Sequence, residues 1–261
     1  MKHQKRNSKR TAIKPRKDSM RPGNALTKII TVSGNLAMEE MERLLADRPN
    51  TGLHPVLFGS KNHADFMAEN CLRVKDPKRI LADSYKIDIP KLIAEWYSSE
   101  DEDELEEQKK AEEDWVAQDV GAAQDKEEIR MDQSLDLECA KEINDRYEGR
   151  WIDVVHIGLL DVEEPWQIFA HVGWEVDGWG NATKCALHRH WQNQWGAEVI
   201  ALQETITECF VKRPPSVRRD AMNLAREQYY YCGDIVHQGV GTIQEHASEL
   251  LNRKQWFFWW D

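Results

Sequence analysis

Apolar residues are unevenly distributed along this chain, and they recur at strand and helix spacings mainly after residue 135. Short runs rich in β-branched and aromatic residues are typical of strands, and apolar residues three or four apart are typical of one helix face. The pattern predicts elements in the order β-β-α-β-β-α-α-β, at residues 151–158, 166–172, 183–195, 197–202, 205–211, from 214, from 242 and at 256–261. This order favours an α+β fold with a mixed or antiparallel sheet flanked by helices.

Turn and cap residues agree with these boundaries. Gly196 follows the expected helix 183–195 and supplies a stop signal for it. Pro214-Pro215 is suited to the start of the next helix. Thr242 and Glu245 have the spacing of a capping box ahead of the last helix. The apolar pattern is therefore consistent with the signals that begin and end each element.

The last expected strand, Trp256-Phe257-Phe258-Trp259-Trp260-Asp261, brings five aromatic rings together. Each such side chain can bury roughly 150–250 Å². We therefore expect a strand that is inserted into a sheet and covered on both faces. The alternative is an aromatic platform for a ligand or partner, with Trp260 and the carboxylate of Asp261 as candidate binding groups.

The N-terminal part predicts a smaller ordered region. Asn35 is placed to cap a helix through about residue 46, and residues 54–59 have the composition of a short buried strand. A second helix is expected from residue 65 to 73, and an apolar cluster over 87–96 closes the region.

Composition divides the whole chain into four parts. We expect a disordered basic tail over residues 1–23, a small α/β region over 24–97, an acidic linker or exposed helix over 98–134, and a C-terminal α+β domain over 135–261.

The formal net charge of -11 changes the range of expected partners. Binding to nucleic acid without sequence preference requires a basic face, so nucleic acid is an unexpected partner except through the tail at residues 1–23. An acidic balance favours a protein partner with a basic surface.

The five cysteines, at irregular spacings and without a C-x-x-C pair, favour reduced thiols over a disulfide framework. A run of about 18 apolar residues, which a membrane span requires, does not occur in the sequence, and the N-terminus has no apolar signal segment. We therefore expect a cytoplasmic protein that does not enter a membrane.

Cys232, Asp234 and His237 form the strongest candidate chemical cluster in the sequence. They could act as a thiol nucleophile with its base, or bind zinc; equally, they could cap a helix end. The histidines at 171, 188 and 190 are a second possible metal group, but residues two apart on a helix point to different faces. Phosphate-loop, metalloprotease and nucleophile-elbow motifs are missing from the sequence. We predict neither a cofactor nor a metal.

Several motifs in one order resemble the family called domain of unknown function 4253. They cover residues 150–261 and comprise Gly178-Trp179-Gly180-Asn181, His190-Trp191, Trp195-Gly196-Ala197-Glu198, Arg213-Pro214-Pro215, residues 231–239 and the ending Phe257-Phe258-Trp259-Trp260-Asp261. The resemblance implies a bacterial or phage origin and a shared fold unit, but no reaction. Glu175-Val176-Asp177 departs from the family pattern, in which a tighter turn is usual.

The glycine-rich loop from Gly173 to Asn181 is the expected binding region. Its candidate binding residues, with the two at the end of the chain, are Trp174, Glu175, Asp177, Trp179, Asn181, Trp260 and Asp261. Small acidic proteins of this kind resemble the immunity proteins encoded beside secreted toxins. The main hypothesis is therefore a non-enzymatic, immunity-like protein-binding module with an acidic, tryptophan-rich surface. The alternative is a thiol- or metal-dependent hydrolase centred on Cys232, Asp234 and His237.

Overall fold

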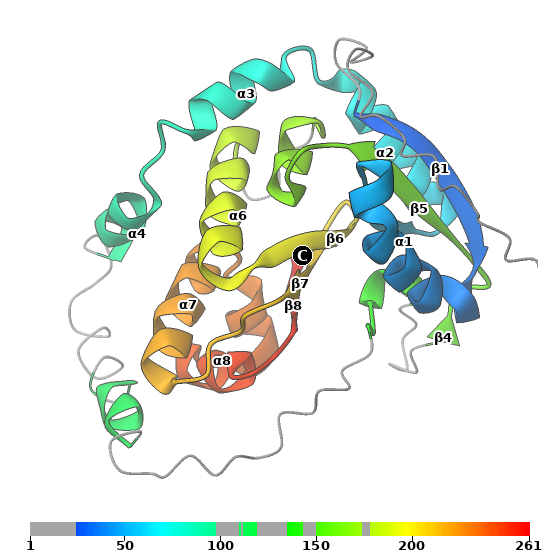
Figure 1. The fold of residues 1–261 in the computed structure, drawn as a ribbon. Coiled ribbons are helices and arrows are strands. Elements are labelled where there is room, and N and C mark those ends of the chain that lie inside the picture. Colours follow the sequence, from blue (N-terminus) through cyan, green and yellow to red (C-terminus); the bar gives the residue numbers. More distant parts are fainter. Residues whose placement is uncertain (1–24, 98–109, 111, 119–134, 143–149, 174–177) are drawn as a thin grey trace, which may run out of the picture.

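A computed structural model describes residues 25–97, 110, 112–118, 135–142, 150–173 and 178–261. The basic tail at residues 1–23 and most of the acidic segment 98–134 lie outside the described residues. The centre of the fold is a six-stranded sheet in the order β1-β5-β2-β6-β7-β8 (Figure 1). Its strands are β1 (Leu26–Ser33), β2 (Leu53–Gly59), β5 (Val154–Asp161), β6 (Ala197–Leu202), β7 (Ile206–Val211) and β8 (Gln255–Trp259).

The sheet is mixed. β2 and β6 pair in parallel through Leu57 and Ala201, whereas β1–β5, β2–β5, β6–β7 and β7–β8 are antiparallel. A separate two-stranded ribbon joins β3 (Lys141–Glu142) to β4 (Arg150–Trp151). The expected α+β fold with a helix-flanked mixed sheet is confirmed.

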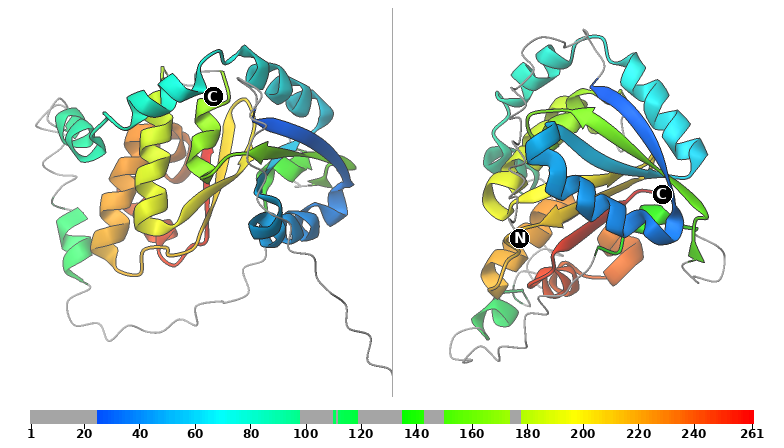
Figure 2. Two further views of the ribbon diagram at one scale, coloured as in Figure 1. Left: turned by 45° about the horizontal axis from the view of Figure 1, so that its top comes forward. Right: turned by 45° about the vertical axis from the view of Figure 1, so that its right-hand side comes forward.

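Helices cover both faces of the sheet (Figure 2). One face packs against a core formed with α2 (Lys61–Arg73), η3 (Pro165–Ala170), α6 (Asn181–Trp195), α7 (Arg218–Tyr231) and α8 (Ile243–Leu250). The opposite face packs against α1 (Ala37–Thr51) and the segment that contains η2 (Glu138–Ala140). The remaining elements are η1 (Gly34–Leu36), α3 (Pro77–Ser84), α4 (Ile89–Tyr97) and the π-helix η4 (Ile235–Val240).

The N-terminal strands are integral to this sheet. β2 lies between β5 and β6, and residues 54–59 of β2 are all buried. The described parts of residues 25–97 and 135–261 therefore share one sheet, a packing that the sequence left open.

The aromatic strand β8 pairs with β7 and lies at the edge of the sheet. Trp256, Phe258 and Trp260 point into the larger core, with exposed fractions of 2%, 0% and 5%. Phe257 and Trp259 are half-buried against the opposite core. The expected strand is present, with apolar packing on both faces, but it borders the sheet and is not inserted between two strands.

Several predicted elements differ from the structure in type or in bounds; for example, the first helix runs from Ala37 to Thr51 with Leu36, not Asn35, at its N-cap. Residues 166–172, expected as a strand, contain the 3-10 helix η3 instead. Pro165 occupies its first turn, and Glu164 and Gln167 cap it reciprocally, so the local signals favour a helix start. The helix expected from Pro214 begins at Arg218.

A buried carboxylate fastens the η2 segment across the second face of the sheet. Glu208 of β7 accepts hydrogen bonds from the backbone N–H groups of Glu138 (3.1 Å) and Cys139 (2.8 Å). Gln203 donates to the carbonyl oxygens of Cys139 and Phe58, at 3.1 and 3.2 Å. Burial raises the pKa of Glu208 to about 7, although the two backbone donors act in the opposite direction.

Candidate functional site

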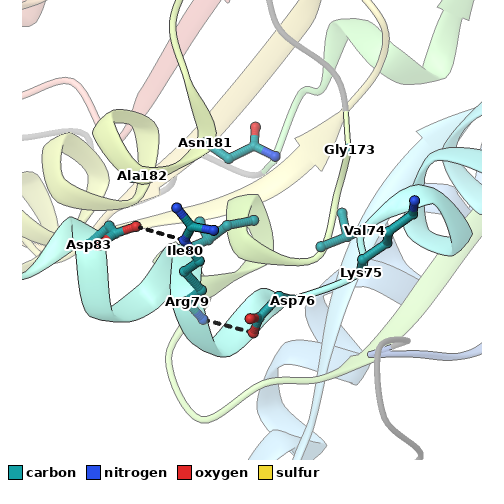
Figure 3. A pocket seen from close by; sticks show the side chains of 9 residues that line it. All are labelled: Val74, Lys75, Asp76, Arg79, Ile80, Asp83, Gly173, Asn181 and Ala182. Atoms are coloured by element: carbon teal, nitrogen blue, oxygen red, sulfur yellow. Dashed lines mark hydrogen bonds and ion pairs between the residues drawn. The ribbon is translucent and has the colours of Figure 1, made fainter.

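A pocket of about 640 Å³ opens between α3 and the start of α6 (Figure 3). Its volume falls in the range of small-ligand sites, which is about 300–1,000 Å³. It is lined by residues from three separate parts of the chain: Val74, Lys75, Asp76, Arg79, Ile80, Asp83, Gly173, Asn181 and Ala182.

Helix α3 forms one wall and presents charges of both signs. Asp76 caps the helix by accepting a hydrogen bond from the backbone N–H of Arg79 at 3.0 Å, and Pro77 occupies the first helical turn. Arg79 lies 3.7 Å from Asp83, which also binds Lys86 at 2.7 Å. The hydrogen bond from Lys86 lowers the pKa of Asp83.

The opposite wall of the pocket is formed by the two ends of the glycine-rich loop, at Gly173 and Asn181. Asn181 donates a hydrogen bond from Nδ2 to the carbonyl oxygen of Val172 at 2.5 Å. The backbone N–H of Gly173 donates to the backbone carbonyl oxygen of Asn70 in α2 at 3.1 Å. A side chain at Gly173 would come within 3.2 Å of Asn70 O and of Val74, so the close approach of the backbone favours glycine. Both ends of the loop are thereby fixed at the pocket.

The predicted binding residues lie in different surroundings. Asn181 lines the pocket, as described above. Trp179 is half-buried, with its ring centroid 4.9 Å from that of Tyr230 and 6.3 Å from that of Tyr231. Trp260 also packs on Tyr231, at 5.2 Å, but it is buried. Asp261 is exposed. Trp174, Glu175 and Asp177 lie outside the described residues.

The candidate catalytic residues each bind groups outside their own trio. Cys232 is buried and donates from Sγ to the carbonyl oxygen of Trp259 at 3.0 Å. Asp234 accepts from Gln238 and from the backbone N–H of Asp261, both at 3.1 Å. His237 Nε2 lies 2.9 Å from the hydroxyl of Tyr229. These contacts hold the end of α7, η4 and the end of the chain together, and they do not favour the hydrolase alternative.

The histidines proposed as a second metal group occupy different surroundings. His188 is fully buried, with Nε2 3.3 Å from the Tyr231 hydroxyl and Nδ1 3.9 Å from Cys209 Sγ. His190 Nε2 lies 3.3 Å from a carboxylate oxygen of Glu227, and His171 follows η3. In the part of the chain that the structure describes, no group of three or more His, Cys, Asp or Glu side chains is arranged to hold a metal ion.

Four of the five buried thiols are poorly suited to act as nucleophiles. Burial raises the pKa of Cys71 and Cys185 to about 12 and raises that of Cys139 and Cys209 as well. A thiol in this state carries almost no thiolate at neutral pH.

Buried histidines predict that the protein loses stability in acid. Burial lowers the pKa of His54 and His246 to about 4 and that of His188 to about 3, from 6.5. Below pH 6.5 the unfolded chain therefore binds more protons than the folded chain. Each of these histidines lowers the free energy of unfolding by about 3 kcal/mol once the pH falls to about 4. Glu208 opposes this change, because its raised folded pKa favours protonation of the folded state between about pH 4.5 and 7.

Three histidines outweigh one glutamate, so we expect the free energy of unfolding to fall continuously from pH 7 to pH 4. Urea unfolding at pH 7, 6, 5 and 4 measures this. In Glu208→Gln the opposing contribution is absent, and the decline should be steeper than in wild type. A flat profile in wild type would contradict the burial of neutral histidines.

The sequence patterns do not predict that residues 74–83 line a site, although the sequence contains a signal for the helix that they form. Asp76 followed by Pro77 is the pattern of an N-cap with proline in the first turn. That signal predicts α3, but it does not indicate that α3 lies against the loop ends.

The fold and pocket define a mixed-sheet α+β protein with a surface site whose charged lining residues are balanced in sign. Residues 156–261 match the model of the family described as Domain of unknown function (DUF4253), which confirms the family resemblance for this part of the chain. Neither the search of curated proteins nor that of solved structures found a match. None of the helices in the described residues is long and apolar enough to cross a bilayer.

Proposed function

We propose that this chain is a non-enzymatic, immunity-like binding module that engages a basic protein partner through the pocket and the loop from Gly173 to Asn181. The observation that carries the proposal is that both ends of this loop are fixed at the pocket, through Gly173 on α2 and Asn181 on Val172. A loop anchored at both ends on rigid elements is a frequent arrangement for recognition.

Charge supports a basic partner. The pocket rim itself is balanced, with Asp76 and Asp83 beside Lys75 and Arg79. The sequence between the fixed loop ends adds Glu175 and Asp177, so the site as a whole has an excess of acid. An acidic surface of this kind accelerates association with a basic surface and weakens as salt increases.

Tryptophan contributes less to this surface than the sequence suggests. Trp166, Trp191, Trp256 and Trp260 are buried, and Trp179 is half-buried beside the loop. The proposed interface therefore depends on the loop carboxylates and the pocket, with the Trp179 ring as its apolar contact.

Neutralising the two loop carboxylates tests the proposal. We expect Glu175→Gln/Asp177→Asn to lose at least about tenfold in affinity for the partner captured from native lysate at low salt, because two charged contacts are removed. Affinity is measured by quantitative pull-down with the tagged full-length protein at low and high salt.

The matched control is Glu39→Gln/Glu42→Gln on α1. It removes the same charge from two exposed residues on a helix that covers the opposite face of the sheet. Equal capture by both variants, or capture that salt does not weaken, would count against the proposal.

A further inference from the structure

A short helical segment, residues 112–117, lies against α7 (Figure 2). Glu112 at its start is 4% exposed, although its neighbours Glu113 and Asp114 are exposed. The Oε2 atom of Glu112 accepts hydrogen bonds from two guanidinium nitrogens of Arg226, with the Nε contact at 3.0 Å. A carboxylate is thus held by arginine at a buried position, where charge-assisted hydrogen bonds are strong.

The second anchor follows one turn later. The guanidinium of Arg218 lies 4.9 Å from the ring centroid of Trp115, which is within cation–π range. Arg218 also donates from Nη1 to the carbonyl oxygen of Trp115 at 3.0 Å and to the Gln118 side chain at 3.1 Å. Trp115 and Val116 are half-buried and pack against the larger core.

These contacts fix the direction of the segment. Glu112 at its start binds Arg226, and Gln118, just after its end, binds Arg218, so the segment runs antiparallel to α7. The two arginines are eight residues apart, which corresponds to about 12 Å along a helix. A helix with an acid followed three residues later by tryptophan fits between them.

The buried side of α7 lies in the larger core, and residues 112–118 supply only the half-buried Trp115 and Val116 to its hydrophobic packing. Ala221, Leu224 and Ala225 are buried in the larger core, whose other members come mainly from the sheet, α2, η3, α6 and α8. Residues 112–118 can therefore leave the face of α7 that carries Arg218 and Arg226, and another helix can bind there, while the rest of the fold remains packed.

We infer that this face of α7 is a recognition surface for an acidic amphipathic helix of the form Glu-x-x-Trp, and that residues 112–118 occupy it as an internal ligand. A partner helix with the same chemistry binds by displacing this segment. This surface on α7 lies apart from the pocket of the proposed function. It binds an acidic ligand, whereas the pocket and its loop are proposed to bind a basic partner.

Fluorescence anisotropy with a labelled peptide of residues 108–120 tests the inference on the full-length protein. In Glu112→Ala/Trp115→Ala the internal ligand is disabled, because Arg226 loses its carboxylate partner and Arg218 loses its ring. We expect the peptide to bind this variant at least about tenfold more tightly than wild type, in which the site is occupied.

Arginine variants supply the controls. Adding Arg226→Glu to the disabled variant should abolish peptide binding, whereas adding Arg219→Glu, which reverses an exposed neighbouring charge, should leave most of it. A peptide with both anchor residues replaced by alanine should not bind. Equal affinity for wild type and the disabled variant, absence of binding to that variant, or indifference to Arg226→Glu would overturn the inference.

Hydrogen exchange on wild type provides a measurement that needs no variant. Excess peptide should increase exchange at residues 112–118 and leave α8 unchanged. If saturating peptide leaves hydrogen exchange at residues 112–118 unchanged, the peptide does not displace this segment, and the inference is wrong.

Discussion

A fragment of residues 150–261 is expected not to fold cooperatively, although it contains the whole part matched by the family. The reason is the position of β2 between β5 and β6. Neighbouring strands lie about 4.8 Å apart, so removing β2 leaves a gap of roughly 10 Å across which β5 and β6 cannot pair. The fragment also loses Val56, Leu57 and Phe58, which are 0% exposed.

The expected loss exceeds the whole stability of a typical domain, which is about 5–15 kcal/mol. Circular dichroism melts and the dispersion of amide signals in NMR spectra measure the outcome. A fragment of residues 25–261 retains all six strands and serves as the control; it should melt close to the full chain. A sharp melt of the 150–261 fragment at a similar temperature would show that β2 is dispensable.

Deletion of residues 257–261 is the second change with a very large expected effect. Phe258 is 0% exposed, and its ring stacks on that of Trp191 with centroids 5.5 Å apart and an angle of 2° between the planes. Trp260 packs on Tyr231 at 5.2 Å. Each large core ring is worth about 3–5 kcal/mol, so the deletion should abolish cooperative unfolding.

Two single substitutions on β8 compare how much the side chains on its two faces contribute to stability. Phe258→Ala should lower the free energy of unfolding by about 3–5 kcal/mol. Phe257→Ala, on a ring that is half-buried on the other face, should cost clearly less. Urea unfolding of both variants measures the difference, and similar losses would mean that the two faces of β8 are packed alike.

Sequence patterns identified elements whose signals are local. The strands at 197–202 and 205–211 and the helix at 183–195 were predicted within a few residues, because strand composition, helical spacing and the stop at Gly196 agree. The error at residues 166–172 arose because a short apolar run does not distinguish a buried strand from a buried 3-10 helix. In this case Pro165 and the reciprocal cap decided for the helix.

The candidate site was less accessible to prediction. Asn181 and the glycine-rich loop were identified, but the facing wall comes from α3, about 100 residues earlier in the chain. Nothing in the sequence specifies that residues 74–83 face the loop ends, because that proximity depends on how α2 packs on the sheet and how α3 packs on α6 and η3. The same limit applies to the catalytic candidates, which are near in sequence but bind separate groups.

The placement of β2 also affects how the protein can form during synthesis. β2 ends at Gly59, whereas its neighbours β5 and β6 begin at Val154 and Ala197. At 5–20 residues per second, a ribosome needs roughly 5 to 19 s to make the chain between β2 and β5. During that interval a strongly apolar strand emerges without either neighbour, so chaperone binding to the nascent N-terminal part should matter more for the yield of this protein than its final stability.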